Sequence, residues 1–198
     1  MENLKVIEKI INSELTTKVN TSLIKHGQIY LSIDKNDLPE VLSFLKNNEN
    51  IKCRQLVDIT TVDYPQNELR FKMVYLLLSH EFNLRIILEY FIKEKDSIDS
   101  VVTIFPSANW MEREVFDMYG VQFKNHPDLR RILTDYGFKG HPLRKDFPLT
   151  GFNEVRYSEK EKKVIYEPVK LEQNYRNFDY ESPWEGTKYI KEINKKND

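Results

Sequence analysis

Phe71-Lys-Met-Val-Tyr-Leu-Leu-Leu78 opens a pair of apolar runs in the middle of the chain, and Ile86-Ile-Leu-Glu-Tyr-Phe-Ile92 closes it. Both runs are rich in the aliphatic and aromatic residues that favour β-strands. We expect strands at 70–79 and 82–92, and the short link at 79–82 predicts that they form a hairpin. A further strand-like run precedes them at 55–63. These runs predict a mostly antiparallel sheet.

Helical periodicity flanks this sheet. Apolar residues recur at helical spacing over residues 3–16, which predicts an amphipathic helix. A second helix is expected at 38–47, with Pro39 in its first turn and Asn36 or Asp37 as its cap. Between these helices, the alternation of Ile29, Leu31 and Ile33 with polar residues predicts a half-buried strand. The fold class is therefore α+β, with helices flanking the sheet, over a first domain at residues 1–136.

Composition excludes several classes of protein. The chain has 198 residues and a net charge of −1, which argues against a strongly basic nucleic-acid binder. Cys53 is the only cysteine, so neither an internal disulfide nor a cysteine-ligated iron–sulfur cluster can be built from this chain alone. The glycine-rich nucleotide loops and the His-Glu-x-x-His zinc motif are absent from the sequence. We therefore expect no cofactor and no metal in this chain.

Asn109-Trp-Met-Glu-Arg-Glu-Val-Phe-Asp-Met-Tyr-Gly120 is the clearest helix in the sequence. Asn109 and Glu112 have the spacing of a capping box, and Gly120 falls where a left-handed C-cap is expected. Arg113 and Asp117 are spaced as an i, i+4 ion pair.

The carboxylates of this helix have two possible roles. Glu112, Glu114 and Asp117 could form an acid/base site. The favoured interpretation is structural: a cap, an ion pair within the helix and a carboxylate that bonds elsewhere, with Arg130 and Arg131 as counter-ions.

Two His-Pro pairs follow the helix. His126 and His141 could form a metal site with Asp128 or Asp146, but the favoured interpretation is that each marks the entry to a turn. Residues 124–163 carry more Lys and Arg than Asp and Glu. Because acidic residues are interspersed, a protein-docking strip is favoured over a nucleic-acid surface.

Residues 137–198 form the second predicted domain, a long irregular extension that binds a partner. Proline and glycine interrupt it, yet it is rich in aromatic residues, which disordered linkers lack. We expect these rings to be buried against a partner, with Trp184 and the tyrosines as anchors and Arg144, Lys145 and Arg156 facing partner acids. The aromatic residues of this stretch are Phe138, Phe147, Phe152, Tyr157, Tyr166, Tyr175, Phe178, Tyr180, Trp184 and Tyr189.

Several motifs carry a family resemblance. Ala108-Asn-Trp-Met-Glu-Arg-Glu-Val-Phe-Asp-Met-Tyr-Gly-Val-Gln-Phe123 and Asn125-His-Pro-Asp-Leu-Arg-Arg131 resemble the signature of one respiratory complex I family, the 30 kDa or C-type subunit, whose mitochondrially encoded form is subunit 9. Gly140-His-Pro-Leu-Arg-Lys-Asp-Phe-Pro-Leu-Thr-Gly151, Tyr166-Glu-Pro-Val169 and Phe178-Asp-Tyr-Glu-Ser-Pro-Trp-Glu185 continue the likeness. It covers residues 54–186 well and the N-terminal third loosely.

The resemblance implies a non-redox core subunit in the peripheral arm of proton-pumping NADH:quinone oxidoreductase. Its partners would be the quinone-site subunit, of the 49 kDa or D type, and neighbouring iron–sulfur subunits, with membrane association only through the complex. FMN, iron–sulfur clusters, NADH and quinone would lie in other subunits. The motif positions are interpreted as architectural or interfacial, with none catalytic. They are Glu112, Arg113, Glu114, Asp117, Gly120, His126, Pro127, Asp128, Leu129, Arg130, Arg131, Pro142, Arg144, Lys145 and Asp146.

Two further expectations concern location and activity. The single alanine, Ala108, is typical of an AT-rich genome. It favours the matrix side of the mitochondrial inner membrane, with the cytoplasmic face of a bacterial inner membrane as the alternative. The competing hypothesis for activity is a free-standing enzyme that uses the carboxylates between Glu112 and Asp117.

Overall fold

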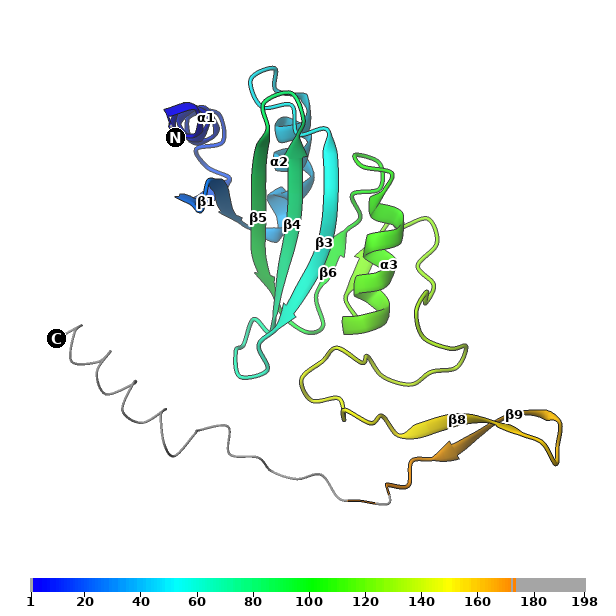
Figure 1. The fold of residues 1–198 in the computed structure, drawn as a ribbon. Helices are drawn as coiled ribbons and strands as arrows, with labels where there is room; N and C mark the ends of the chain where they lie inside the picture. The colour runs from blue at the N-terminus through cyan, green and yellow to red at the C-terminus, as the bar shows by residue number, and fades with distance from the viewer. Residues whose placement is uncertain (1, 172, 174–198) are drawn as a thin grey trace, which may run out of the picture. The chain divides into compact units, whose positions relative to one another are not determined.

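The computed structural model describes residues 2–171 and residue 173 (Figure 1). The chain divides into two compact units, the first reaching Gly151 and the second beginning at Phe152. The predicted anchors Tyr175, Phe178, Tyr180, Trp184 and Tyr189 lie outside the described residues, as does the motif that contains Trp184.

The first unit is built on a five-stranded sheet with the order β1-β2-β5-β4-β3. Its strands are β1 (Val19–Lys25), β2 (Gln28–Ile33), β3 (Gln55–Asp63), β4 (Phe71–Ser79) and β5 (Leu84–Ile92). All neighbours are antiparallel except β2 and β5, which run parallel with Ile29 opposite Ile86. The mixed α+β class and the β4–β5 hairpin are confirmed. Strand β1, which forms a hairpin with β2, was not predicted from the sequence.

Alternation along the strands places the core on one face of the sheet. Every second residue of β4 and β5 is buried, from Phe71 to Ser79 and from Leu84 to Ile92. At the centre, the rings of Tyr75 and Tyr90 stack with centroids 5.9 Å apart, and their hydroxyl oxygens lie 3.2 Å apart. Helices α1 (Glu2–Glu14) and α2 (Leu38–Asn47) contribute apolar residues to the same core. Figure 1 shows α2 behind β4 and β5.

Helix α2 has the predicted bounds, and its predicted apolar face, Leu38, Val41, Leu42 and Leu45, is buried. Asp37 occupies the N-cap position but its side chain makes no capping hydrogen bond. A short 3-10 turn, η1 (Lys35–Asp37), leads into the helix.

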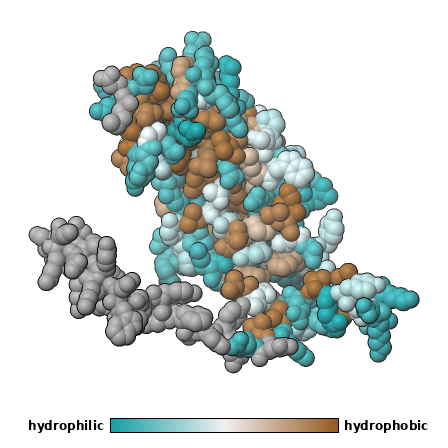
Figure 2. Space-filling view, viewed as in Figure 1, coloured by the Kyte–Doolittle hydropathy of each residue, from teal (hydrophilic) through white to brown (hydrophobic). Residues whose placement is uncertain are grey.

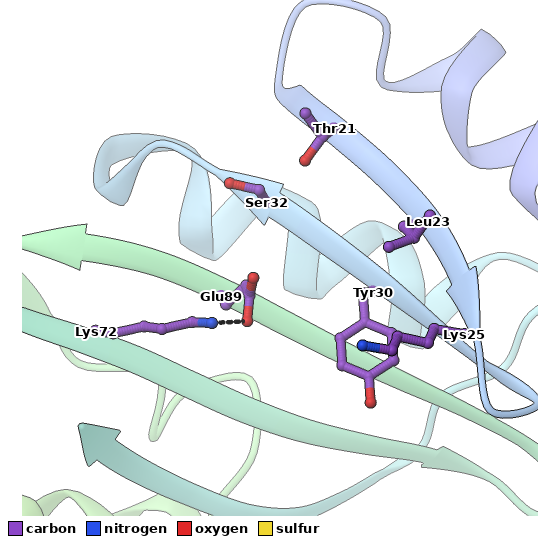
Figure 3. Close-up of a pocket in the computed structure, with 7 residues that line it drawn as sticks. All are labelled: Thr21, Leu23, Lys25, Tyr30, Ser32, Lys72 and Glu89. Atoms are coloured by element: carbon purple, nitrogen blue, oxygen red, sulfur yellow. Dashed lines mark ion pairs between the residues drawn. The ribbon is translucent and has the colours of Figure 1, made fainter. Parts of the chain in front are cut away.

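The opposite face of the sheet is open to solvent. Its central residues include Val74, Leu76 and Ile87, which are half-buried, and Figure 2 shows apolar side chains gathered over this region. A hollow lies beside them (Figure 3), and within it Lys72 forms an ion pair with Glu89. The hollow is lined by Thr21, Leu23, Lys25, Tyr30, Ser32, Lys72 and Glu89.

Helix α3 (Ala108–Tyr119) packs beside β3 and is bracketed by two short strands, β6 (Ser97–Asp99) and β7 (Gln122–Lys124). These strands pair in parallel, with Ile98 opposite Phe123. The segments that enter and leave α3 are thereby joined, so the helix is fixed at both ends. An irregular segment then runs from Asn125 to Gly151.

The second unit contains a hairpin of β8 (Asn153–Ser158) and β9 (Lys163–Pro168), where irregular chain was expected. Arg156 and Glu167 form an ion pair across it, with Nε and Oε2 2.7 Å apart. Val155, Tyr157 and Val164 alternate with these charged residues and are exposed.

Candidate functional site

Helix α3, which carries the central motif, begins differently from the prediction. It starts at Ala108, and Ser107 occupies the N-cap position without a side-chain hydrogen bond. The capping box of Asn109 and Glu112 is therefore wrong. Glu112 points into the core, where its Oε1 accepts a hydrogen bond of 2.7 Å from the backbone N–H of Val101. It thereby supplies a partner for a buried amide in the loop that precedes the helix.

The second oxygen of Glu112, Oε2, is buried without a hydrogen-bond partner among the described residues. The His126 Nε2 atom lies 3.8 Å away but is 3.1 Å from the carbonyl oxygen of Asn109, to which it donates. The other ring nitrogen, Nδ1, accepts from the backbone N–H of Asp128 at 3.0 Å. This arrangement fits a neutral imidazole, which gives Glu112 no counter-charge. Burial raises the pKa of Glu112 to about 7.

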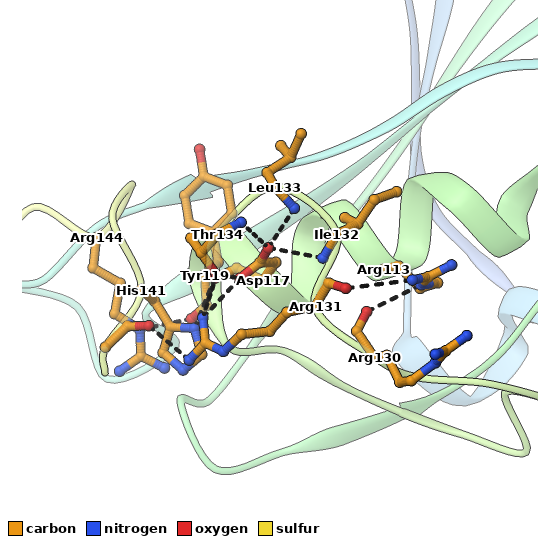
Figure 4. A network of polar contacts seen from close by, with 11 residues as sticks. Arg113, Asp117, Tyr119, Arg130, Arg131, Ile132, Leu133, Thr134, His141 and Arg144 are labelled. Carbon is orange, nitrogen blue, oxygen red and sulfur yellow. Dashed lines mark hydrogen bonds and ion pairs between the residues drawn. The ribbon is translucent and has the colours of Figure 1, made fainter. Parts of the chain in front are cut away.

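Asp117 is fully buried yet ionised, because it receives five hydrogen bonds (Figure 4). Its Oδ1 accepts from Arg131 Nη1 at 2.7 Å and from the Thr134 hydroxyl at 2.6 Å. Its Oδ2 accepts from the backbone N–H groups of Ile132, Leu133 and Thr134 at 2.8–3.0 Å. Burial opposes ionisation, but the hydrogen bonds from residues 132–134 outweigh it and hold the pKa of Asp117 well below its usual range.

Arg113 does not pair with Asp117, so the predicted ion pair within the helix is wrong. Its Nε donates to the carbonyl oxygen of Arg130 at 3.0 Å, and its Nη2 donates to that of Arg131 at 3.3 Å. Of the two predicted counter-ions, Arg131 binds Asp117, whereas the Arg130 side chain binds Asp128 with both Nε and Nη2 at 2.7 Å. The helix is thus joined to the segment after it by one carboxylate and one guanidinium.

The C-terminal carbonyl groups of α3 are all used. Gly120 has φ +81° and closes the helix as predicted, donating to Phe116 O at 2.9 Å. The next three carbonyl oxygens accept from the segment after the helix: Asp117 O from His141 Nδ1 at 2.9 Å, Met118 O from Leu143 N at 3.1 Å and Tyr119 O from Arg144 Nε at 2.6 Å. A Cβ atom on Gly120 would lie 2.5 Å from the His141 ring. The packing therefore requires glycine here.

A second group of charges, around Arg70, ties the same segment to the sheet. Arg70 binds the buried Asp63 in a fork, with Nε–Oδ1 2.7 Å and Nη2–Oδ2 2.9 Å. Asp63 Oδ2 also accepts from the backbone N–H of Lys145 at 2.7 Å, and Asp146 lies 2.9 Å from Arg70 Nη2. Glu94 joins Arg70 to Arg144, with contacts of 3.1 and 2.6 Å. Asp63, Arg70 and Glu94 were not predicted from the sequence, although opposite charges flank the β3–β4 turn.

The remaining motif residues occupy varied environments. Leu129 packs against the core, and Pro142 is half-buried. Pro127, Glu114 and the Lys145 side chain are exposed. The network draws Asp117, Gly120, Arg131, Arg144 and Asp146 onto one segment, and it places Glu112 apart, in the core.

This arrangement does not make a general acid/base pair. Asp117 is saturated by donors, Glu112 is sealed from solvent, and Glu114 alone of the three carboxylates is exposed. What the network can do chemically is fix the backbone of residues 130–146 against α3 and the sheet.

The two His-Pro histidines are not brought together as a metal site. His126 contacts the carbonyl group of Asn109 near the start of α3, and His141 contacts that of Asp117 near its end. Eight residues of helix separate these carbonyl groups by about 12 Å. In the part of the chain that the structure describes, no three His, Cys, Asp or Glu side chains are placed to hold a metal ion.

Comparison with known proteins gives consistent matches. The family described as "Respiratory-chain NADH dehydrogenase, 30 Kd subunit" matches residues 31–153. The C-type subunit of NADH-quinone oxidoreductase from Chelativorans sp. (strain BNC1) is 49% identical over 189 residues, which cover 96% of this chain and 94% of the relative. The same subunit from Ruegeria sp. (strain TM1040) is 54% identical over 167 residues, covering 84% and 83%.

A solved structure is similar in fold. A chain of the membrane-bound sulfane sulfur reductase, described as an archaeal respiratory membrane complex, aligns with a TM-score of 0.66 at 22% identity. The alignment covers 89% of this chain and 100% of the other. Among the described residues, no helix of this chain has the length and apolar character needed to cross a membrane.

Proposed function

The chain belongs to the family of 30 kDa subunits of respiratory-chain NADH dehydrogenase, and we propose that it is a non-redox subunit that supports the quinone-site subunit of NADH:quinone oxidoreductase. The observation that carries this proposal is the match to bacterial C-type subunits over nearly the whole chain, at about half of all positions. The geometry of α3 supports a structural role, because its buried carboxylates are used to hold backbone.

The proposal that this chain holds no redox group of its own rests on the sequence. Cys53 is the only cysteine in the full chain, and burial raises the pKa of its thiol to about 12. One protonated thiol does not provide the thiolates that iron–sulfur clusters require. FMN, the clusters, NADH and quinone would then be held by other subunits, and this chain would shape and stabilise their surroundings.

The partners we propose are the quinone-site subunit of the 49 kDa type and neighbouring iron–sulfur subunits, with residues 137–198 bound along one of them. The β8–β9 hairpin supports this, because Val155, Tyr157 and Val164 expose an apolar face. Two-stranded hairpins are marginally stable in water without such a face being covered. Truncation after Gly151 is expected to leave a folded first unit that fails to enter the complex. Equal protection of the hairpin from protease in the free chain and in the complex would contradict this.

The two relatives from Chelativorans and Ruegeria are bacterial, which favours the cytoplasmic face of a bacterial inner membrane over the mitochondrial matrix. In either place the chain would reach the membrane through the complex. Sequencing the genome around the gene would decide between the two.

The proposed function is tested by expressing the full chain in a bacterium that lacks its own 30 kDa subunit. We expect the chain to migrate with a large membrane complex on native gels and to restore NADH:quinone reductase activity in the membranes. A soluble, folded chain that stays outside the complex would refute the proposal. The purified chain, given NADH and a soluble quinone, is expected to show no turnover. Turnover would favour the free-standing enzyme.

A further inference from the structure

A small exposed surface lies where α3 meets the segment after it. We call it the α3 patch and define it as Trp110, Arg113, Leu133 and Tyr136. Trp110 and Leu133 are each 62% exposed, and Tyr136 is fully exposed. Trp, Tyr and Arg are the residue types most enriched at the energetic centres of protein interfaces. Large apolar side chains this exposed lose little by becoming covered and gain buried area.

Direct contacts connect the patch. The Arg113 guanidinium lies over the Trp110 ring, 5.1 Å from its centroid. The same guanidinium bonds the carbonyl groups of Arg130 and Arg131 (Figure 4), and Tyr136 lies within electrostatic range of Arg130. The backbone N–H of Leu133 is held by Asp117 at 2.8 Å. The patch is therefore supported by a fixed backbone, which lowers the entropy lost when a partner binds.

Arg113 gives the patch its chemical preference. Its Nε and one N–H of Nη2 are occupied by the two carbonyl groups, and the Nη1 end of the guanidinium has no acceptor among the described residues. A planar guanidinium held in this way matches the two oxygens of a carboxylate. Carbonyl acceptors orient the guanidinium but do not neutralise it.

No carboxylate in the described part of the chain bonds Arg113. Asp128 acts on it only through space and is itself bound by Arg130 at 2.7 Å. Glu114 is adjacent in sequence, and neighbouring residues on a helix face different directions. A positive charge flanked by apolar side chains is thus left for an external anion.

We propose that the α3 patch docks another subunit of the same complex through an Asp or Glu of that subunit, which binds Arg113 while apolar neighbours cover Trp110 and Tyr136. The inference rests on the proposed function, which supplies the multi-subunit assembly. Charge complementarity selects the partner's acid, and the exposed rings select an apolar surround. A second copy of this chain or its own residues 174–198 are the other possible occupants, and crosslinking separates them.

The test uses the full chain in a bacterium that lacks its own 30 kDa subunit. Trp110→Glu places a carboxylate beside Arg113 and repels the partner's acid, and Tyr136→Glu does so at a fully exposed position where folding is not at risk. Val6→Glu is the matched control, because Val6 is 56% exposed on helix α1. We expect both patch variants to lower the fraction of chain in the complex by about tenfold, with unchanged circular dichroism, and the control to behave as the unmodified chain.

A photo-crosslinking residue at position 136 identifies the occupant. An adduct with a different subunit of the complex is expected. Adducts found only within the chain, or only between two copies of it, would overturn the proposal. So would full assembly of Trp110→Glu and Tyr136→Glu, and this result would leave the proposed function intact. Failure of the unmodified chain to assemble would instead refute the proposed function, and the docking surface with it.

Discussion

Replacing Asp117 by Asn tests whether this carboxylate organises the segment after α3. The carboxylate accepts five hydrogen bonds, including one from the Arg131 guanidinium. An amide keeps one acceptor oxygen and turns an NH2 group towards donors, whichever way it is oriented. Breaking a buried ion pair costs about 3–5 kcal/mol. The Arg131 side chain is 25% exposed and regains some hydration, so we expect a loss of about 3–4 kcal/mol.

Urea denaturation of the full chain, followed by circular dichroism, measures this loss. Glu114→Gln is the control, because Glu114 is exposed on the same helix, and its effect should stay within about 0.5 kcal/mol. The folded pKa of Asp117 is lowered, so its ionisation stabilises the protein above the unfolded pKa of about 4. That stability is lost as the pH falls through the folded pKa, so the difference between the two proteins should shrink below about pH 4. A loss under about 1 kcal/mol at pH 7 would refute the reasoning.

Three other substitutions follow from the same contacts. Gly120→Ala should destabilise by about 2–3 kcal/mol, because a positive φ and a blocked Cβ position act together, whereas Gly137→Ala, with the same φ of +81° and nothing within 4 Å, should cost about 1 kcal/mol; thermal melts compare them. Glu112→Gln should flatten the pH dependence of stability between about pH 4.5 and 7. In the unmodified chain the raised pKa of Glu112 makes stability fall as the pH rises through that window, and a parallel decline in the variant would contradict this. Arg70→Lys should cost about 2–3 kcal/mol because lysine cannot form the fork to a buried carboxylate, and Arg130→Lys, in an exposed pair, under about 1 kcal/mol. Equal losses for the two lysine variants in urea titrations would show that burial does not matter here.

Local patterns in the sequence predicted the regular core well. Helix α2 was placed correctly because four apolar residues recur at helical spacing directly after Pro39. Strands β4 and β5 were found because their apolar runs are long and their link is short. Strands β6 and β7 were missed because each has only three residues, and they pair across the whole length of α3. A pairing that depends on such a distant partner leaves little trace in either segment.

The candidate site was predicted in part. The resemblance identified the residues that the network uses, and Arg131 as a counter-ion and Gly120 as a cap were correct. The partner of Arg113 was wrong because spacing along a helix cannot reveal that two carbonyl groups of another segment compete for the guanidinium. Glu112 looked like a cap because cap and core positions share the same spacing, and only the buried amide of Val101 explains why it turns inwards.

The parallel pairing of β2 with β5 constrains the order in which the chain can fold during synthesis. Strand β2 leaves the ribosome well before β5, and only β1 is then available to it. The β3–β4–β5 meander can form from local hairpins once Ile92 has emerged, and the N-terminal hairpin must then close a long loop to join its edge. Until that closure, the buried faces of α1 and β2 remain uncovered, and the nascent chain passes through its most aggregation-prone interval.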